Sequence, residues 1–242
     1  YHVIPQTFHE LKETLGRDDL TPEQREWTLQ GISKRYAEHI ARLGKKPLPP
    51  WKDALQCFDD MRELDLMPKE VHYSNMIVLT SKIKSKDRAS AWMLSLHLLR
   101  EMEEAVGNLN ATAVESALKV FRKAGKDDLC TELLDEANGK EGEEWLKLPR
   151  ECFLHGLQSC AHNGLWEKAL AYVEDVRERK LHARGDMWSE AYMAAEEAGQ
   201  YEAAEAIAQT LAELGFELHL PSEEQMWQYV TRGRSKELLK GQ

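Results

Sequence analysis

The chain has 242 residues, of which 42 are acidic and 32 basic, so its formal net charge is −10 at pH 7. This length allows one or two globular domains or an array of repeats, and the acidic balance disfavours strong binding to a phosphate backbone. No stretch approaches the roughly 20 apolar residues of a membrane span, and no secretory signal peptide is visible. Removal of an organellar presequence would fit the start at Tyr1.

The composition predicts an all-α protein. Glu, Ala, Leu and Lys are abundant, and no stretch alternates apolar and polar residues as strands do. The four cysteines occupy apolar helical positions rather than a spaced framework, which indicates small core residues in a reducing compartment. They are Cys57, Cys130, Cys152 and Cys160.

Residues 1–50 are predicted to form an N-terminal arm and an atypical capping helix. Thr21 is a helix-capping residue, Pro22 suits a first turn, and Gln24 completes a capping box. A helix is therefore expected from Pro22 to about Leu43, where the stretch GKKPLPP stops it. A shorter helix is expected within the arm, over residues 8–15.

Near the C-terminus the sequence repeats itself with a period of 35 residues. Residues 151–185 superpose on residues 186–220 with glycine, aromatic, alanine and acidic positions in one register. The aligned pairs include Gly164 with Gly199, Trp166 with Tyr201, Ala169 with Ala204 and Glu178 with Glu213. Each unit has the apolar spacing of two short helices separated at its glycine. Such a pair cannot bury its apolar face alone, so the units must stack into an α-solenoid.

Several stretches resemble pentatricopeptide repeats. The run NGLWEKALAYVEDV at 163–176 is similar to the second helix of that motif, as is ALQCFDDMREL at 54–64 with the following Met67-Pro68 linker. Tetratricopeptide repeats, with a period of 34, are the nearest alternative, and the offset of 35 favours the pentatricopeptide interpretation. The resemblance implies degenerate helical repeats over 51–220, with a C-terminal capping helix and basic tail over 221–242.

The predicted first helices are unevenly spaced along the chain. Their expected starts are Val71, Thr112, Glu151, Asp186 and Pro221. The two wider intervals indicate insertions near residues 82–88 and 139–145. Loops of this kind are where a repeat scaffold acquires private contacts.

The resemblance implies a mode of RNA recognition that pairs one residue near the fourth place of each first helix with one just before the next repeat. Ser74 with Asn110 fits such a base-recognition pair. The other matching positions hold Glu115 with Pro149, Leu154 with Arg184, and Ser189 with His219. Because these side chains suit base edges poorly, the code is largely absent.

Basic clusters and tryptophans provide the other candidate contacts. The basic clusters indicate either solvated helix ends or phosphate contacts at the edge of a ribonucleoprotein. They comprise Lys82, Lys84, Lys86 and Arg88, and then Arg232 and Arg234 with Lys236 and Lys240 in the tail. The tryptophans near unit ends or insertions are candidate partner anchors, namely Trp27, Trp51, Trp145 and Trp227.

No catalytic residue, metal site or cofactor is predicted. Cys152, His155, Cys160 and His162 lie on one helix, where Cys160 faces away from the two histidines, so four ligands cannot converge. No glycine-rich phosphate loop, nucleophile elbow or metalloprotease helix appears.

The resulting hypothesis is a non-catalytic, pentatricopeptide-like scaffold subunit of an organellar ribonucleoprotein, foremost a mitochondrial or plastid ribosome. Its partners would be protein subunits of a large assembly, with contacts to RNA backbone. An RNA-binding factor for transcript processing or stability is the first alternative. A protein-only scaffold in a respiratory or photosynthetic complex is the second.

Overall fold

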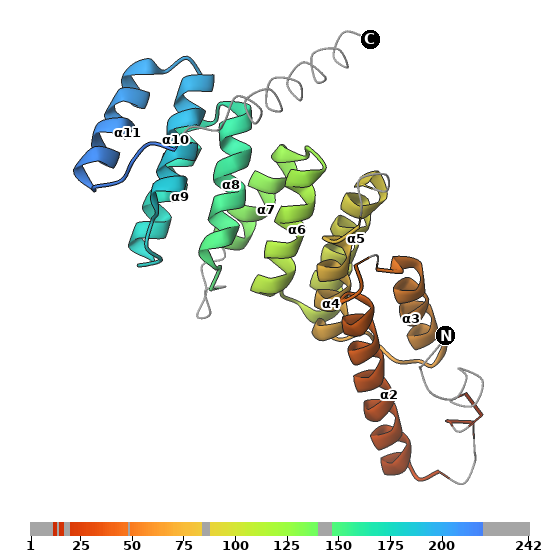
Figure 1. Ribbon diagram of the computed structural model, residues 1–242. Coiled ribbons are helices and arrows are strands. Elements are labelled where there is room, and N and C mark those ends of the chain that lie inside the picture. Colours follow the sequence, from red (N-terminus) through yellow and green to blue (C-terminus); the bar gives the residue numbers. More distant parts are fainter. Residues whose placement is uncertain are drawn as a thin grey trace. The chain divides into compact units, whose positions relative to one another are not determined.

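The computed structural model describes residues 12–13, 15–16, 20–47, 49–83, 88–139 and 147–219. Across these residues the regular secondary structure is entirely helical (Figure 1). The chain divides into two compact units, Tyr1–Val120 and Phe121–Gln242, and α6 contains the boundary between them. The helices are α2 (Pro22–Leu43), α3 (Trp51–Glu63), α4 (Glu70–Thr80), α5 (Arg88–Val106), α6 (Ala111–Lys123), α7 (Asp127–Gly139), α8 (Arg150–Asn163), α9 (Trp166–Glu178), α10 (Gly185–Glu197) and α11 (Tyr201–Glu213).

Helix α2 begins and ends where its sequence predicts. The Gln24 backbone N–H donates to Thr21 Oγ1 over 3.2 Å, and the Thr21 N–H donates to Gln24 Oε1 over 3.0 Å. These reciprocal bonds satisfy two amides that the first turn of a helix leaves without a partner. The predicted capping box is therefore confirmed.

In the first unit, α2 packs against α3 and α4, and α4 packs against α5. Their shared core includes Tyr36, Ile40 and Phe58, all almost inaccessible to solvent. Two buried or half-buried polar side chains of α4 fasten it to the backbone of α2. His72 Nε2 lies 2.9 Å from the Ser33 carbonyl oxygen, and the Asn75 amide donates to the Ala37 carbonyl over 3.0 Å.

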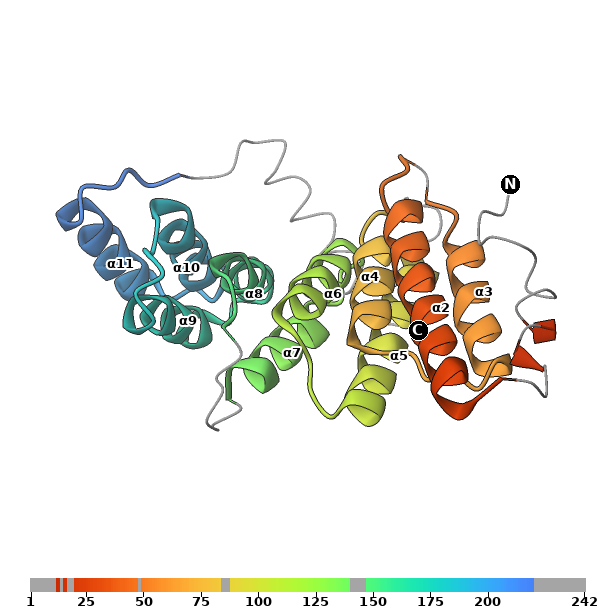
Figure 2. The ribbon, with the colours of Figure 1, turned by 90° about the horizontal axis from the view of Figure 1, so that it is seen from below.

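In the second unit α8, α9, α10 and α11 each pack against the next helix along the chain or its hairpin partner, and α8 also packs extensively against α10 (Figures 1 and 2). Helices α8 and α9 are separated by Gly164, and α10 and α11 by Gly199. Both glycines have positive φ values, 65° and 69°. This left-handed conformation closes the first helix of each hairpin, because glycine adopts it without a side-chain clash. The predicted 35-residue helical hairpin is confirmed.

Polar contacts also tie the second unit together. His162 Nδ1 of α8 lies 2.7 Å from Asp127 Oδ2 of α7, and both side chains are buried. On α9, the Tyr172 hydroxyl donates to Asp135 of α7 over 2.6 Å, and Lys168 makes an ion pair with the same carboxylate. The chain thus has the predicted all-α architecture of stacked helix-turn-helix repeats.

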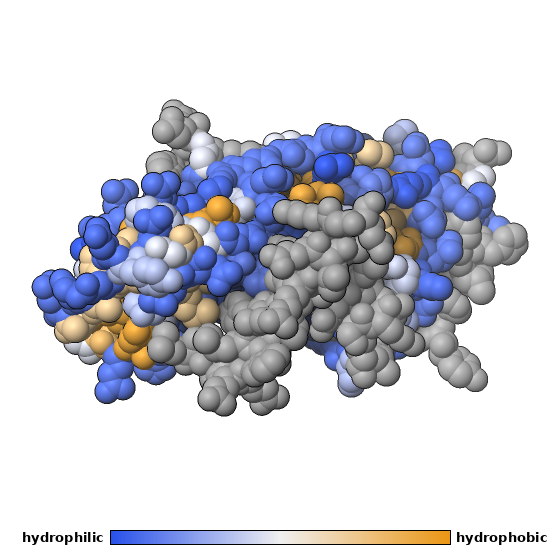
Figure 3. All heavy atoms as spheres, turned by 90° about the horizontal axis from the view of Figure 1, so that it is seen from above, coloured by the Kyte–Doolittle hydropathy of each residue, from blue (hydrophilic) through white to orange (hydrophobic). Residues whose placement is uncertain are grey.

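Some predictions fall on residues outside the described ranges. The short helix expected at 8–15 is described only at residues 12, 13 and 15, and both expected insertions lie largely in undescribed segments, as does everything from residue 220 onward. On the face seen in Figure 3, the described surface is mostly hydrophilic with small apolar areas. Among the described helices, none combines the length and hydrophobicity that a membrane crossing requires.

The closeness of the hairpins can be tested at two helical glycines. A Cβ added at Gly156 of α8 would overlap the buried Leu134 side chain and lie 3.0 Å from Tyr172 Cε2, whereas one at Gly31 of α2 would meet nothing within 4 Å. We expect Gly156→Val to lower the free energy of unfolding by about 1–3 kcal/mol through overpacking. Gly31→Ala should raise it by about 0.5–1 kcal/mol. Urea unfolding measures both, and a destabilising Gly31→Ala or a neutral Gly156→Val would contradict this packing.

Candidate nucleic-acid interface

The predicted recognition residues occupy equivalent places in four helices. Each is the fifth residue of its helix, counted from the observed start of α4, α6, α8 and α10. These residues are Ser74, Glu115, Leu154 and Ser189. Three of their predicted partners, Asn110, Pro149 and Arg184, immediately precede the next of these helices. The recognition positions therefore coincide with the ends of helices, where backbone groups need capping.

The structure brings Ser74 and Asn110 together. The Asn110 side-chain amide donates to Ser74 Oγ over 2.5 Å and to the Glu70 carboxylate over 2.6 Å. The Asn110 Oδ1 atom accepts the backbone N–H of Ala113 over 2.8 Å, which caps the first turn of α6. Ser74 in turn donates its hydroxyl proton to the Glu70 carbonyl oxygen over 2.9 Å.

These hydrogen bonds use most of the capacity that a base edge would need. Both amide protons of Asn110 and the hydroxyl proton of Ser74 already have acceptors, and the Ser74 side chain is buried. Glu70 adds a negative charge directly beside the pair. Binding a base here would require the protein to exchange internal hydrogen bonds for external ones, with little net gain.

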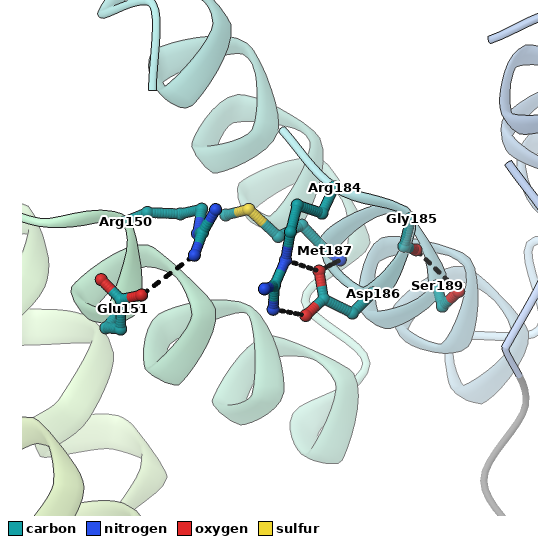
Figure 4. Close-up of polar contacts among 7 residues, drawn as sticks. All are labelled: Arg150, Glu151, Arg184, Gly185, Asp186, Met187 and Ser189. Carbon is teal, nitrogen blue, oxygen red and sulfur yellow. Dashed lines mark hydrogen bonds and ion pairs between the residues drawn. The ribbon is translucent and has the colours of Figure 1, made fainter. Parts of the chain in front are cut away.

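A second polar cluster lies at the starts of α8 and α10 (Figure 4). The Arg184 guanidinium holds the Asp186 carboxylate through two nitrogens, and Asp186 also accepts the Met187 backbone N–H over 3.0 Å. Arg150 and Glu151 form a separate ion pair at 3.1 Å. Each arginine in this cluster is therefore matched by a carboxylate.

The protonation equilibria of this cluster favour the charged forms. The hydrogen bonds that Arg184 donates to the Asp186 carboxylate raise the pKa of Arg184. The pKa of Glu151 is lowered, first by its own backbone N–H and then by Arg150. At neutral pH the two pairs are thus neutral overall, which weakens their attraction for an RNA backbone.

The remaining predicted pairs offer little to a nucleotide. Leu154 is a half-buried apolar side chain and Glu115 is a half-buried carboxylate, and their predicted partners are Arg184 and Pro149 respectively. Ser189 repeats the pattern of Ser74, because it donates to the Gly185 carbonyl over 2.8 Å and accepts a backbone N–H, that of His219, over 3.0 Å. The two serines therefore hold backbone rather than exposing free hydroxyls.

The described basic candidate also has an internal partner. Lys82 Nζ donates to the Gly44 carbonyl oxygen over 2.6 Å, where it caps the end of α2. Lys84, Lys86, Arg232 and Arg234 lie outside the described residues, as does the side chain of Arg88.

Two of the four candidate tryptophans lie among the described residues, and two lie outside them. Trp27 on α2 is 79% exposed, whereas Trp51 is half-buried at the start of α3. Trp145 and Trp227 lie outside the described residues. A shallow groove of about 410 Å³ runs between α2 and α4, and its lining includes Lys34, Lys69 and Val71.

Two side chains that complete the polar clusters were not predicted from sequence. Glu70 bonds the Ser74–Asn110 pair, and Asp186 bonds Arg184. Both are acidic residues in the first turn of a helix, a position that favours negative charge. The preference for acidic residues in the first turn of a helix is the sequence feature from which these two side chains could have been predicted.

The cysteines occupy the core. All four are buried, and burial raises the pKa of Cys57, Cys130 and Cys160 to about 12, so these thiols stay protonated near neutral pH. Within the described ranges, no group of three His, Cys, Asp or Glu side chains could hold a metal ion.

Similarity to known proteins appears in the fold and not in the sequence. No family model and no curated protein matches the sequence. The pentatricopeptide repeat domain of Arabidopsis thaliana protein-only RNase P 1 (PRORP1), solved in complex with tRNA, has a TM-score of 0.62 at 10% identity and covers 84% of this chain and 99% of that one. The nuclear proteinaceous RNase P 2 (PRORP2) of A. thaliana has a TM-score of 0.65 at 13% identity over 82% of this chain.

This chain spans 41% of the PRORP2 chain, so the match covers less than half of that enzyme. Identities this low establish similarity of fold alone. The resemblance to pentatricopeptide repeats that the sequence suggested is confirmed at that level.

Glu190 of α10 is a half-buried carboxylate whose ionisation should make the stability of the fold depend on pH. The side chain is half-buried, and its Oε2 atom has no hydrogen-bond partner among the described residues. Burial raises its pKa from 4.5 to about 6, while Gln158 and Arg122 offset only part of that effect. The folded protein thus binds the proton more tightly than the unfolded chain does, so this group stabilises the fold below about pH 4.5 and loses that contribution as pH rises through about 6.

We therefore expect Glu190→Gln to raise the free energy of unfolding near pH 7 by about 1–2 kcal/mol. The difference in the free energy of unfolding between the two proteins should vanish near pH 4, where glutamate and glutamine at position 190 are both neutral. Urea unfolding at the two pH values measures it. An equal effect of the substitution at both values would show that ionisation of Glu190 is not the cause.

Proposed function

We propose that this protein is a non-catalytic scaffold subunit of an organellar ribonucleoprotein, with a mitochondrial ribosome as the first candidate and a plastid one as the second. The observation that carries the proposal is the internal pairing of the recognition positions. Ser74, Asn110 and Ser189 hold the backbone of their own repeats, and Arg184 is neutralised by Asp186. Such a surface supports a role in which helical hairpins bind proteins and RNA contacts remain peripheral.

The distribution of charge supports the same conclusion. The last described hairpin, residues 185–219, contains acidic residues and no lysine or arginine. Its acidic residues are Asp186, Glu190, Glu196, Glu197, Glu202, Glu205, Glu213 and Glu217. A hairpin of this charge repels a phosphate backbone and favours a protein partner.

The second candidate function, as an alternative to the scaffold role, is an RNA-binding factor for organellar transcripts. A specific observation favours it. Ser74 and Asn110 come from consecutive helical pairs and lie next to each other, which is the placement that recognition of one base by two side chains requires. The groove between α2 and α4 also places Lys34 and Lys69 on one side of the array. The similarity to a domain bound to tRNA is consistent with this candidate.

Binding of the free protein to short single-stranded RNA separates the two candidates. For a scaffold, we expect weak binding without sequence preference that decreases steeply with salt. Ser74→Ala and Asn110→Ser should leave the affinity unchanged within about twofold, since serine retains the helix cap that asparagine provides. Fluorescence anisotropy with homopolymeric and mixed 20-nucleotide probes measures this.

Lys34→Gln with Lys69→Gln is the matched variant that removes charge from the groove. It should weaken binding to all probes alike, because phosphate contacts carry no sequence information. Tight binding to one RNA, with a base preference that changes in Ser74→Ala, would establish the second candidate instead. A protein that binds no RNA under low salt would favour a scaffold in a complex without RNA.

A further inference from the structure

We propose that copies of this chain associate head to tail, with the outward face of α2 on one copy packing antiparallel against the outward face of α11 on the next. We call these surfaces the α2 face and the α11 face. The α2 face comprises Trp27, Gly31, Lys34, Arg35, Glu38, Arg42 and Lys45, the last in the turn after the helix. The α11 face comprises Tyr201, Glu202, Glu205, Ala206, Gln209, Ala212 and Glu213. This contact does not require RNA, although Lys34 also lines the groove between α2 and α4.

The α2 face is basic and carries an exposed aromatic side chain. At about 100° per residue, its members lie opposite the buried stripe that includes Ile32, Tyr36 and Ile40. Its four basic side chains are exposed, and no ion pair to Lys34, Arg35 or Arg42 occurs among the described residues. A tryptophan that is 79% exposed is a large apolar surface to leave in water.

The α11 face has the opposite charge and a similar design. It lies across the helix from the buried side chains Ala204, Ile207 and Leu211. Its three glutamates and two alanines are exposed, and Tyr201 at one end is 68% exposed. Alanine and glycine permit close approach of two helices, so the small residues on each face leave room for the large ones on the other.

The charged residues match in spacing as well as in sign. Lys34 and Arg42 are eight residues apart, as are Glu205 and Glu213, which corresponds to about 12 Å along a helix. When the two helices are antiparallel, a single register places three basic residues of the α2 face opposite three glutamates of the α11 face. The pairs are Lys34 with Glu213, Arg42 with Glu205, and Lys45 with Glu202.

In the same register the exposed tryptophan extends beyond the end of α11. Trp27 lies seven residues before Lys34, so it extends past Glu213 toward the segment that follows α11. Leu214 and Phe216 of that segment are 47% and 39% exposed. The row of ion pairs would therefore fix the position and direction of the contact, with Trp27 at its edge.

The symmetry of this contact determines what it builds. The two faces are different surfaces of one chain, so each copy retains a free face after pairing, and association continues into chains or closed rings. Exposed ion pairs each contribute little and are screened by salt. The assembly should consequently be weak, concentration-dependent and strongly sensitive to ionic strength.

Sedimentation velocity over a concentration series provides the first test, with the full-length protein. We expect the average mass to increase with concentration at about 50 mM salt, and the dissociation constant to rise at least about tenfold at about 500 mM salt. A monomer at every concentration in low salt would overturn the proposal.

Charge reversal provides the decisive test. Two variants reverse the charge of one face each, and in both the dissociation constant of self-association should rise at least about tenfold. They are Lys34→Glu with Arg42→Glu, and Glu205→Lys with Glu213→Lys. Mixing the two variants should restore self-association, because each reversed face then meets a face of opposite charge. The variant Glu167→Lys with Glu178→Lys, on exposed positions of α9, replaces two glutamates by lysines as the α11 reversal does, so it changes net charge by the same amount. It should still undergo the salt-dependent self-association of the unmodified protein.

Circular dichroism verifies that the variants fold, and Lys34→Gln with Arg42→Gln replaces the reversal if one does not. Self-association that survives both reversals overturns the proposal. Two folded variants that stay monomeric when mixed also overturn it, because the assigned pairing would then be wrong. A loss of association in the α9 control equal to that in the reversed variants would reduce the effect to net charge and would likewise overturn the proposal.

Discussion

The structure depends on the inability of a short helical hairpin to bury its own apolar face. Helices of 11 to 14 residues, such as α4 and α8, are marginal in isolation and gain most of their stability from packing. Each hairpin must therefore approach its neighbours closely. In the second unit this approach relies on small residues, since Gly156 lies against Leu134 and Tyr172, and Ala169 and Ala204 are almost fully buried.

Stacking of this kind requires each helix to begin at a defined place, and the first-turn side chains provide that definition. Ser74 and Ser189 hold the backbone at equivalent places in the two units, while Asn110 joins the start of α6 to α4. Three of the positions that the pentatricopeptide resemblance assigns to base recognition, Ser74, Asn110 and Ser189, thus link segments of neighbouring repeats. A side chain whose hydrogen bonds link neighbouring repeats recognises a base poorly, because those hydrogen bonds must break before it can bind the base.

Local signals predicted the fold well, and tertiary contacts explain what they missed. The capping box at Thr21 and the glycine at 164 act within a few residues, so α2 and the α8–α9 hairpin could be predicted from sequence. The sequence alone indicates a solvated or phosphate-binding charge at Lys82, because its acceptor, the Gly44 carbonyl, is 38 residues away. Glu70 was missed in the same way, since its amide partner Asn110 comes from the next helical pair. The sequence pairs Ser74 with Asn110 as candidate base-recognition residues, and the three-dimensional structure shows that they contact each other with the Glu70 carboxylate beside them.

The central claim is that Asn110 is a joint between repeats, and the side-chain amide of that residue reports it directly. In the 15N-labelled protein, the two amide protons of Asn110, assigned by their loss in Asn110→Ser, should exchange slowly with solvent because both are hydrogen-bonded. Their chemical shifts and exchange rates should stay unchanged when single-stranded RNA is added to saturation. Rapid exchange in the free protein, or a large shift of these resonances on addition of one RNA sequence, would contradict the account and make Asn110 a base-recognition residue.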